Sequence, residues 1–350
     1  MTKNGISINE KEKFYKSKNP KISIIIAVYN AEGYIKNALQ SIQNQDFKDI
    51  EIIVVDDFSK DNSVFLIKTL IKNDPRIILF QNKENRGTLY TKTRGALLSK
   101  GKYIMILDQD DMYAQKNSLS TLYRIIEKKK LDILGFAELI SNFNLTQKKG
   151  IHHYIKTKVL FQPDIEGMMY AHNKYGEIRR TGDVIWCYIY KSKLFKKIIN
   201  QIDNKFLYTK MIRHEDFLLF FLLTRNAFNF QQIKKIFYCQ LIWDKIDPLI
   251  NFSIKEKIRN RENMNCQSFI NYIEFLLIKT NNTIYDKKIA SYELENYYLN
   301  NYCRNNSFIM ERGKKVCKLF LENEYIENNI KNKIYFFLNE TDYNSFNSYK

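Results

Sequence analysis

The sequence predicts an α/β fold of the Rossmann-like type, in which helices flank a mostly parallel central sheet. Three observations lead to this prediction. Short runs of β-branched residues alternate along the chain with longer amphipathic segments. Polar residues directly follow several of these runs, and no internal repeat of fixed period is seen. Alternating strands and helices form right-handed βαβ units, which place successive strands parallel to one another.

The strands of the first half are recognised by their apolar runs. The segment ISIIIAV at 22–28 is almost entirely apolar and β-branched, which is typical of a strand buried on both faces. Pro20 precedes this segment and Tyr29-Asn30 follows it. We predict the first four strands at residues 22–28, 50–55, 77–80 and 103–107.

Helices are predicted in the intervals between and after these strands. In the first interval the apolar residues recur at a spacing that gives one apolar helix face. They are Tyr34, Ile35, Ala38, Leu39 and Ile42. The predicted helices cover residues 31–45, 60–72, 87–99 and 117–130. Gly101 is predicted to cap the C-terminal end of the third helix.

The second half alternates less regularly. Residues 138–162 have no clear period and are interpreted as a variable excursion, whereas residues 182–190 are apolar and aromatic. The predicted elements are strands at 133–136 and 233–239 and helices at 163–173, 193–200 and 215–226. From Ile254 onward the sequence predicts helices separated by Asn-rich turns.

The composition indicates a globular chain with a sizeable core. The chain has 350 residues, of which 45% are hydrophobic. No apolar run reaches the roughly 18 residues that a membrane-spanning helix needs. Residues 1–20 are polar, lack the apolar core of a signal peptide and are interpreted as a flexible leader. Because the five cysteines form no CxxC pair, we expect reduced thiols and a cytoplasmic protein.

The formal net charge of +18 has two interpretations. It fits an anionic partner such as a nucleic acid, a membrane surface or a phosphorylated substrate. It also fits a general compositional bias, because Lys, Asn and Ile are abundant throughout. The basic residues do not form one block with interleaved aromatics, so we predict no nucleic-acid partner. Peripheral contact with an anionic membrane surface stays open.

Three acids within four positions follow the strand predicted at 103–107. Ionised carboxylates are not buried without partners, so Asp108, Asp110 and Asp111 should lie where the strand leaves the sheet. Because acids this close repel one another, a cation between them is favoured. Hard oxygen ligands suit Mg²⁺ or Mn²⁺, which keep positions open for substrate phosphates. The alternative interpretation is a solvated acidic turn that caps the next helix.

Polar residues also follow the first two strands, as Tyr29-Asn30 and Asp56-Asp57. In parallel sheets ligands bind at the carboxyl ends of the strands. Three polar clusters are therefore expected at one edge of the sheet, which strengthens the metal hypothesis.

Four segments, in this order and spacing, resemble the family 2 glycosyltransferases. They are KISIIIAVYN at 21–30, IVVDDFSKDNS at 53–63, NRG at 85–87 and LDQDD at 107–111. The resemblance is tight over residues 21–115 and looser as far as residue 240. It implies the GT-A fold and the inverting transfer of a sugar from a nucleoside-diphosphate sugar, with a UDP-linked donor favoured.

The resemblance also suggests how the chain is divided. We predict a leader at 1–20, a GT-A glycosyltransferase domain at 21–245 and a helical C-terminal region at 246–350. Within the domain, residues 21–136 form the nucleotide-sugar-binding half and residues 137–245 form the acceptor half.

On the donor side the resemblance assigns a role to each polar cluster. Tyr29 resembles the residue that stacks near the nucleotide base. Asp56 or Asp57 resembles the acid that accepts hydrogen bonds from the uracil or ribose. Asp108 resembles the ribose-side acid of the DxD motif and Asp110 its metal ligand. Mn²⁺ or Mg²⁺ would bridge the diphosphate and stabilise charge on the leaving group.

Structural roles remain open for these residues. Asp111 is a further acid of the metal site, which either binds the metal directly or supports the residues that bind it. Asp56 or Asp57 is alternatively an N-cap for the helix predicted from Lys60, although Ser59 could supply that cap. Tyr29 is alternatively an aromatic residue that ends a strand.

The sequence departs from the family pattern at three donor-side positions. Ala27, which we keep among the donor-binding residues, stands where proline is usual, and Phe58 stands where glycine is usual. Phe58 implies a different turn beside the base pocket. Lys92 takes the place of an arginine and is interpreted as a donor phosphate or base contact, with a solvated helix lysine as the alternative.

The catalytic base is expected on the acceptor side. An inverting transferase needs a carboxylate that takes the proton of the attacking hydroxyl. The segment RHEDFLL at 213–219 resembles the family's Glu-Asp motif, which makes Asp216 the first candidate and Glu215 the second. These acids alternatively complement the dipole of the helix they open. His214 is either a neighbour of the metal or acceptor or a structural histidine.

An aromatic segment precedes this motif. Trp186 to Tyr190 resembles the acceptor-side aromatic stretch of the family, with Asp183 just before it. Aromatic rings suit sugar faces, but packing in the core explains them equally well.

Together these features predict a metal-dependent glycosyltransferase that acts on a carbohydrate, lipid-linked or glycoprotein acceptor. A sugar-nucleotide nucleotidyltransferase is the first alternative, but its Gly-rich phosphate loop is missing from Val28-Tyr29-Asn30-Ala31. A non-catalytic basic binding module is the second, and it leaves the acids at the strand ends without a role.

Overall fold

The computed structural model describes most of the first 242 residues and short stretches beyond them. The described residues are 19–142, 148–151, 158–162, 170–172, 178–180, 184–209, 211, 215–242, 271–272, 274–275, 294, 316–318, 321, 331–332 and 334. Contacts divide the chain into two compact units. The first comprises Met1–Ala171, Arg180–Met211 and Glu215–Asp247, and the second comprises His172–Arg179, Ile212–His214 and Pro248–Lys350. The main sheet and the site described below belong to the first unit.

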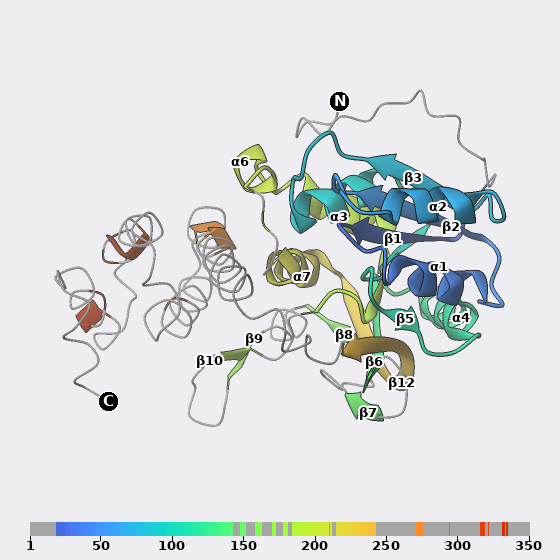
Figure 1. Cartoon of the computed structure of the whole chain (residues 1–350). Helices are drawn as coiled ribbons and strands as arrows, with labels where there is room; N and C mark the ends of the chain where they lie inside the picture. Colours follow the sequence, from blue (N-terminus) through green and yellow to red (C-terminus); the bar gives the residue numbers. More distant parts are fainter. Residues whose placement is uncertain are drawn as a thin grey trace. The chain divides into compact units, whose positions relative to one another are not determined.

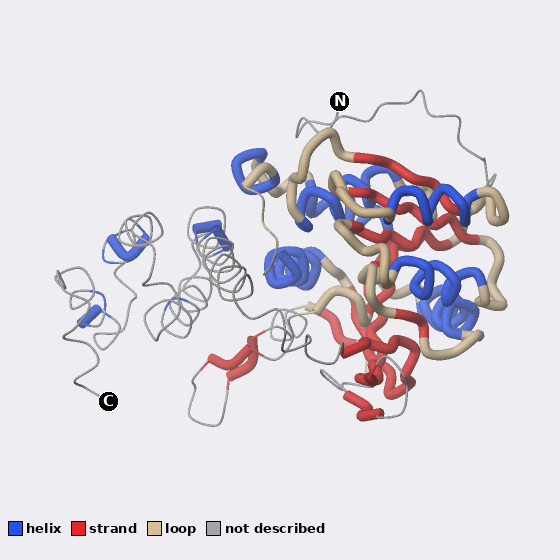
Figure 2. The backbone as a smooth tube through the Cα atoms, in the orientation of Figure 1, coloured by secondary structure: helices blue, strands red, loops and turns tan. Residues whose placement is uncertain are grey.

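The first unit is built on a ten-stranded sheet (Figures 1 and 2). Its main path has the order β3-β2-β1-β4-β11-β6-β12-β5, with β7 beside β6 and β8 beside β12. The strands are β1 (Ile22–Val28), β2 (Ile50–Asp56), β3 (Ile77–Gln81), β4 (Tyr103–Ile106), β5 (Met112–Tyr113), β6 (Ile133–Asn142), β7 (Lys148–Ile151), β8 (Leu160–Phe161), β11 (Tyr188–Lys191) and β12 (Asn229–Ile242). A separate two-stranded sheet joins β9 (Tyr170–His172) and β10 (Ile178–Arg180).

The direction of the strands changes halfway across the main sheet. β1 is parallel to β2 and β4, and β2 is parallel to β3. β11 is antiparallel to both of its neighbours, β4 and β6, whereas β12 is parallel to β6. The predicted α/β fold is confirmed. The carboxyl ends of β1 to β4 lie at one edge, where the predicted donor-side residues follow them.

Helices flank the sheet in Figures 1 and 2. They are α1 (Ile35–Gln43), α2 (Ser63–Ile71), α3 (Thr88–Leu98), α4 (Ser118–Lys129), α5 (Ser192–Ile199), α6 (Asn204–Leu207) and α7 (Glu215–Asn226). The bounds of α7 are those predicted. α1 and α2 begin later than predicted, because residues 29–32 and 59–62 hydrogen-bond to one another as loops instead of entering the helices.

α3 lies close against β1 and β2. A Cβ atom added at Gly95 would come within 2.5 Å of Ile25 Cγ2 and 3.3 Å of Val55 Cγ2. Both of these side chains are fully buried. The absence of a side chain at Gly95 therefore sets the distance between α3 and the sheet, and α3 carries Lys92.

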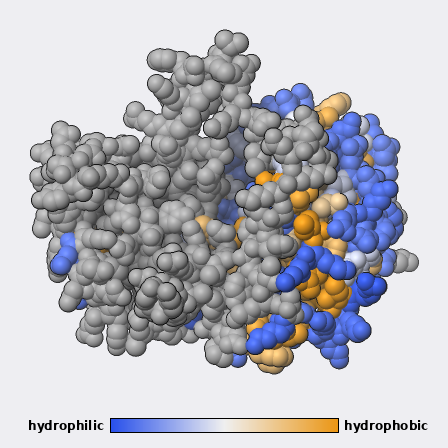
Figure 3. Space-filling view, turned by 90° about the horizontal axis from the view of Figure 1, so that it is seen from below, coloured by the Kyte–Doolittle hydropathy of each residue, from blue (hydrophilic) through white to orange (hydrophobic). Residues whose placement is uncertain are grey.

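On the face seen in Figure 3, the described residues are mostly hydrophilic, and the hydrophobic ones gather in one band. A few large hydrophobic side chains are exposed among the described residues. They are Tyr29, Phe58, Phe65, Phe161 and Phe228. Two of them, Tyr29 and Phe58, follow β1 and β2 at the carboxyl edge of the sheet, where a ligand is expected.

Gly101 does not cap α3, contrary to the prediction. The helix ends at Leu98 and its C-cap residue Ser99 is already extended. A Cβ atom at Gly101 would lie 2.6 Å from the backbone nitrogen of Ser23. Gly101 N–H donates to Ser23 Oγ over 2.8 Å and to Glu51 Oε1 over 3.1 Å. The glycine is required by close approach to β1.

Two further predictions of the second half are corrected. Residues 170–172 form strand β9 instead of part of a helix, and the remainder of the segment 163–173 lies outside the described residues. β6 continues to Asn142, well beyond the predicted end at Phe136, because it pairs with β12 along its length. The excursion predicted from residue 138 therefore begins inside the sheet.

The predicted C-terminal helices lie almost wholly outside the described residues, and the domain boundaries stay a prediction. The short described stretches beyond residue 270 are helical. Within the part of the chain that the structure describes, no helix is both long enough and apolar enough to cross a membrane.

Candidate active site

The loops after β1 and β2 are held together by side-chain hydrogen bonds. Asn30 N–H donates to Ser59 Oγ over 3.0 Å, and Lys60 N–H donates to Asn30 Oδ1 over 2.8 Å. Gln109, in the acidic turn, binds the backbone of Tyr29, because its Oε1 accepts a hydrogen bond from Tyr29 N–H over 2.8 Å. Three strand ends are thereby fixed to one another, as the sequence predicted for this edge.

Tyr29 and Phe58 present aromatic rings at this edge. They are 45% and 39% exposed, respectively. Phe58 has a φ of 68°, the left-handed region that glycine favours. The Lys60 ammonium lies 3.4 Å from the centroid of the Phe58 ring, an arrangement that permits a cation–π interaction. Ala27 is the one residue of β1 that is not fully buried.

Asp57 organises the loop that leads into α3. Its carboxylate accepts from Asn82 Nδ2 over 2.7 Å and from the N–H groups of Arg86 and Gly87, each over 2.8 Å. Asn82 Nδ2 also donates to Thr91 Oγ1, next to Lys92. Because Asp57 is only 4% exposed, only a small part of its surface would be accessible to a bound nucleotide-sugar donor.

Asp56 is buried, and its carboxylate accepts a long hydrogen bond from Ser59 N–H at 3.3 Å. The alternative role of an N-cap for α2 is wrong for Asp56, Asp57 and Ser59. α2 begins at Ser63, and its N-cap residue is Asn62. The Ser63 N–H is instead accepted by Asp61 Oδ1 over 3.0 Å.

Asp111 is held inside the acidic turn. Its Oδ2 accepts from the Tyr238 hydroxyl over 2.7 Å and its Oδ1 accepts from Leu241 N–H over 2.9 Å. The same hydroxyl accepts from Asp108 N–H over 3.3 Å. Burial, followed by the charges of Asp108 and Asp110, raises the pKa of Asp111 to about 8. Both oxygens of Asp111 are in use, which favours a place behind the ligands over direct metal binding.

Asp108 and Asp110 are the accessible acids of the turn. Burial and the charge of Asp108 raise the pKa of Asp110, which shows that the two carboxylates repel each other. Among the described residues no group of three or more His, Cys, Asp or Glu is arranged to hold a metal ion. Two carboxylates fit a cation such as Mg²⁺ or Mn²⁺, whose remaining ligands are water and phosphate oxygens.

Lys92 connects the acidic turn to the start of α7. Its Nζ lies 3.3 Å from Asp108 Oδ1, 3.0 Å from Glu215 Oε1 and 3.1 Å from Asp216 Oδ1. The interpretation of Lys92 as a solvated helix lysine is wrong, because only 2% of the residue is exposed. The structure thus brings the predicted donor-side acid and both predicted bases around one ammonium group.

The pKa values of Lys92 and Asp216 are shifted within this cluster. Burial alone would lower the pKa of Lys92, but the charges of Asp108, Asp216 and Glu215 raise it well above its usual range. Burial raises the pKa of Asp216 well above its usual range, in spite of the opposing charge of Lys92. The Asp216 side chain is 16% exposed and that of Glu215 is 6% exposed, so Asp216 is the more accessible of the two candidates.

The aromatic segment before α7 divides between the core and the site. Tyr188 and Tyr190 are fully buried, so core packing explains them. Trp186 is half-buried, its Nε1 donates to Glu138 Oε2 over 2.7 Å, and its ring centroid lies 6.3 Å from that of Tyr238. Asp183 and His214 lie outside the described residues.

Sequence reasoning missed two residues of this site. Glu138 is 1% exposed and Tyr238 is fully buried. A single acid within the apolar run ILGFAELI was the available signal for Glu138. No local signal marks Tyr238, because its partners Asp108 and Asp111 lie more than a hundred residues earlier.

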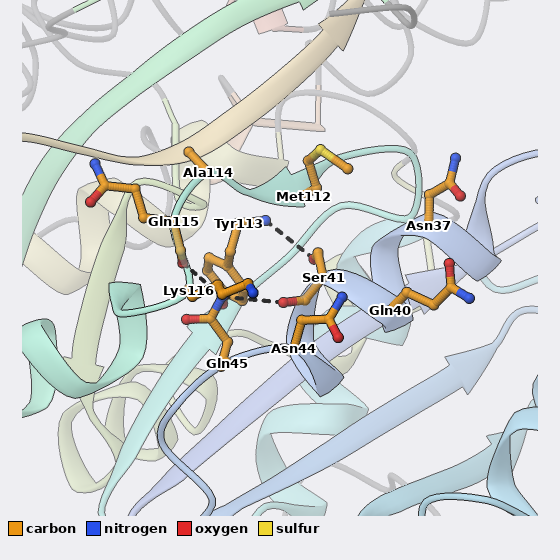
Figure 4. Close-up of a pocket in the computed structure, with 10 residues that line it drawn as sticks. All are labelled: Asn37, Gln40, Ser41, Asn44, Gln45, Met112, Tyr113, Ala114, Gln115 and Lys116. Carbon is orange, nitrogen blue, oxygen red and sulfur yellow. Dashed lines mark hydrogen bonds between the residues drawn. The ribbon is translucent and has the colours of Figure 1, made fainter.

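A pocket of about 280 Å³ lies between α1 and β5 (Figure 4). The side chain of Gln45 lines this pocket and is held in place, because its Nε2 donates to the carbonyl oxygens of Ser41 and Gln115. Tyr113 N–H donates to Ser41 Oγ over 3.2 Å. None of the predicted site residues lines this pocket, so we place the active site at the carboxyl edge of the sheet instead.

Comparison with known protein families assigns the chain to one of them. Glycosyl transferase family 2 matches residues 23–217, which is more than half of the chain. The chain belongs to this family. The match includes β1 to β4, the acidic turn and the first residues of α7.

Individual relatives cover shorter segments. The chain is 36% identical over 132 residues to the GalNAc(5)-diNAcBac-PP-undecaprenol beta-1,3-glucosyltransferase of Campylobacter jejuni, a match over 37% of this chain and 40% of that protein. It is 33% identical over 113 residues to the glycosyltransferase GlyG of Streptococcus pneumoniae, over 32% and 37% respectively. The matches span less than half the length of these relatives.

Among solved structures, S. aureus TarS 1–349 in complex with UDP-GlcNAc has a TM-score of 0.60. The match covers 89% of this chain and 83% of that one, at 16% identity. At this identity the likeness concerns the fold. It confirms the GT-A type of α/β fold predicted from the sequence.

Proposed function

We propose that the protein transfers a sugar from a nucleoside-diphosphate sugar, a UDP-linked one by preference, to an acceptor hydroxyl with inversion. One observation carries the proposal. The ammonium of Lys92 joins Asp108, at the end of the donor-side strand β4, to Asp216, at the start of α7. A donor-side acid and a candidate base therefore belong to one cluster, as a single-displacement reaction requires.

The donor would lie over the carboxyl edge of β1, β2 and β4. The exposed ring of Tyr29 suits stacking on the base, next to the partly exposed Ala27. Asp56 is the last residue of β2, the strand beside β1, and Asp57 follows it. These two acids would accept hydrogen bonds from the base or ribose. Asp108 would serve the ribose and the metal together.

Asp110 and Asp108 would hold Mn²⁺ or Mg²⁺, with Asp111 supporting the turn from behind. The cation would supply positive charge to the diphosphate as the leaving group develops negative charge. Tyr238 fixes the turn through its bonds with Asp108 and Asp111, so the partly exposed carboxylates of Asp108 and Asp110 are positioned for the cation.

Asp216 would act as the general base, with Glu215 as the alternative. A carboxylate whose pKa is raised by burial is a stronger proton acceptor than an exposed one. Asp216 would take the proton of the acceptor hydroxyl while its oxygen forms a bond to the anomeric carbon. The bond between that carbon and the phosphate oxygen breaks at the same time, which inverts the configuration.

The acceptor would be a carbohydrate, a lipid-linked glycan or a glycoprotein. The name of the Campylobacter jejuni relative describes an undecaprenol-linked acceptor, which favours a lipid-linked glycan. Such an acceptor would bring the chain to an anionic membrane surface from the cytoplasm, where its net charge of +18 would favour peripheral binding.

Calorimetric titration of the full chain with UDP, with and without Mn²⁺, tests the donor site. We expect binding that Mn²⁺ strengthens, followed by slow hydrolysis of one UDP-sugar in a screen of donors. Release of pyrophosphate from a sugar phosphate and UTP would instead identify a nucleotidyltransferase. If no nucleoside diphosphate binds in a metal-dependent way, the proposal is wrong.

A further inference from the structure

The ammonium group of Lys92 contacts three carboxylates, and little of it is accessible to a ligand. An ammonium group has three N–H donors and no acceptor. The three carboxylates of Asp108, Glu215 and Asp216 lie within 3.3 Å of Nζ, and those of Glu215 and Asp216 accept hydrogen bonds from it. With 3% of its side chain exposed, Lys92 has almost no surface left for a phosphate.

A donor phosphate would have to displace one of these carboxylates. The displaced acid would remain buried near two others with less positive charge to offset it, which is costly. With every carboxylate ionised, the three acids and one ammonium already leave a formal charge of −2. The divalent cation proposed at Asp108 and Asp110 would offset this negative charge, so a donor phosphate would be attracted to the cation and not to Lys92.

We propose that Lys92 is a positioning residue that fixes Asp216 with respect to Asp108, and that it does not contact the donor diphosphate. This inference rests on the proposed function and replaces the donor contact predicted for Lys92. The ammonium engages Asp216 Oδ1. The other oxygen, Oδ2, is thereby oriented to accept the proton of the acceptor hydroxyl.

The surrounding residues explain why Lys92 is suited to this role. α3 is pressed against the sheet at Gly95, so the backbone that carries Lys92 has little freedom to move. Thr91 Oγ1 donates to the Gly87 carbonyl oxygen over 2.9 Å and accepts from Asn82, which also donates to Asp57. The lysine is therefore placed by the same network that shapes the donor side.

Lys92→Met in the full chain tests the inference. We expect kcat for sugar transfer to fall about 100-fold, as for a misplaced catalytic group. The Kd for UDP with Mn²⁺ should not rise, because no diphosphate contact is lost and the negative charge of Asp108 is no longer offset by Lys92. Lys92→Arg keeps the charge and should recover part of kcat, because a guanidinium can still join two carboxylates.

The opposite pattern would overturn the inference. A charge-assisted hydrogen bond to a phosphate is worth about 1.5–3 kcal/mol, so its loss would weaken UDP binding about tenfold or more. That result, with kcat unchanged at saturating donor, would make Lys92 a diphosphate contact. Lys68→Met, at an exposed lysine of α2, is the matched control and should change neither quantity.

A double variant covers the case in which Lys92→Met does not fold. Lys92→Met with Glu215→Gln removes one positive and one negative charge, so the formal charge of the cluster stays at −2. We expect this variant to fold, to bind UDP and to remain slow, whereas wild-type kcat would refute the bridge. A wild-type chain that binds no UDP would refute the proposed function itself, which keeps the two failures distinct.

Discussion

Phe58 combines a strained backbone with an exposed aromatic ring. A bulky residue with a φ of 68° costs about 1–2 kcal/mol relative to glycine. Strain of this kind persists mainly at functional sites. Because Phe58 follows Asp57 at the carboxyl edge of β2, its exposed ring would be available to stack on the base of the proposed donor.

We therefore expect Phe58→Gly to separate stability from binding. Strain relief is offset by the flexibility of glycine and by the lost contact with Lys60, so the free energy of unfolding should change by less than about 1 kcal/mol. The Kd for UDP should rise about tenfold, as for loss of one base stack. Denaturant unfolding and calorimetry measure the two quantities.

Phe65→Ala supplies the control for this experiment. Phe65 is 69% exposed on α2, away from the predicted base contact, and its loss should leave UDP binding unchanged. If Phe58→Gly binds UDP as tightly as the wild type, Phe58 has no role in the donor site.

Asp216 and Glu215 are adjacent and both bind Lys92, so only substitution separates their roles. Asp216→Asn preserves shape and removes the proton acceptor. We expect it to keep UDP binding and to lower kcat for transfer about 100-fold or more, the usual contribution of a general base. Glu215→Gln should retain most of the activity, and the reverse order of the two rates would make Glu215 the base.

Among the elements, α3 connects packing to the site most directly. A Cβ atom at Gly95 would meet Ile25 Cγ2 at 2.5 Å, and overpacking of this kind costs about 1–3 kcal/mol. Gly95→Ala should therefore lower the free energy of unfolding by that amount. It should also lower kcat, since any shift of α3 carries Lys92 with it.

Gly33→Ala is the matched control, because a Cβ atom there would have no neighbour within 4 Å. Urea unfolding and steady-state kinetics of both variants provide the comparison. An unchanged stability of Gly95→Ala would mean that α3 does not lie as close to β1 as the structure indicates.

The elements also show how far the sequence could predict the fold. The continuous apolar runs of β1 and β2 identify buried parallel strands. The apolar run of α7, between its acidic first turn and its polar end, identifies the bounds of this helix. Loops such as 29–32 and 59–62 could not be told from helix starts, because their hydrogen bonds join residues about thirty positions apart. Gly101 was misassigned for the same reason, since Ser23 is its partner.

For the molecule as a whole, the candidate site is assembled from distant parts of the chain. The acids at the ends of β2 and β4 could be predicted, because local pattern places each of them at one edge. The partners of Lys92 could not be predicted, because Glu215 and Asp216 lie more than a hundred positions away. Tyr238 and Leu241, which fix Asp111, are equally remote.

The acidic turn also links the stability of the whole molecule to pH. Burial and the charges of Asp108 and Asp110 raise the pKa of Asp111 to about 8, whereas an unfolded Asp titrates near 4. The folded chain therefore holds a proton there that the unfolded chain has released. The stability from this group is fully present below the unfolded pKa and is lost as pH rises toward 8.

We therefore expect the Tm of the metal-free protein to fall between about pH 5 and pH 8. Asp111→Asn, which stays neutral, should flatten this slope, whereas Asp49→Asn at an exposed position should not. Mn²⁺ should raise Tm more at pH 8 than at pH 5, because it binds ionised carboxylates. A Tm that is independent of pH without metal would show that Asp111 is ionised in the folded chain, and calorimetric scans across this range decide the matter.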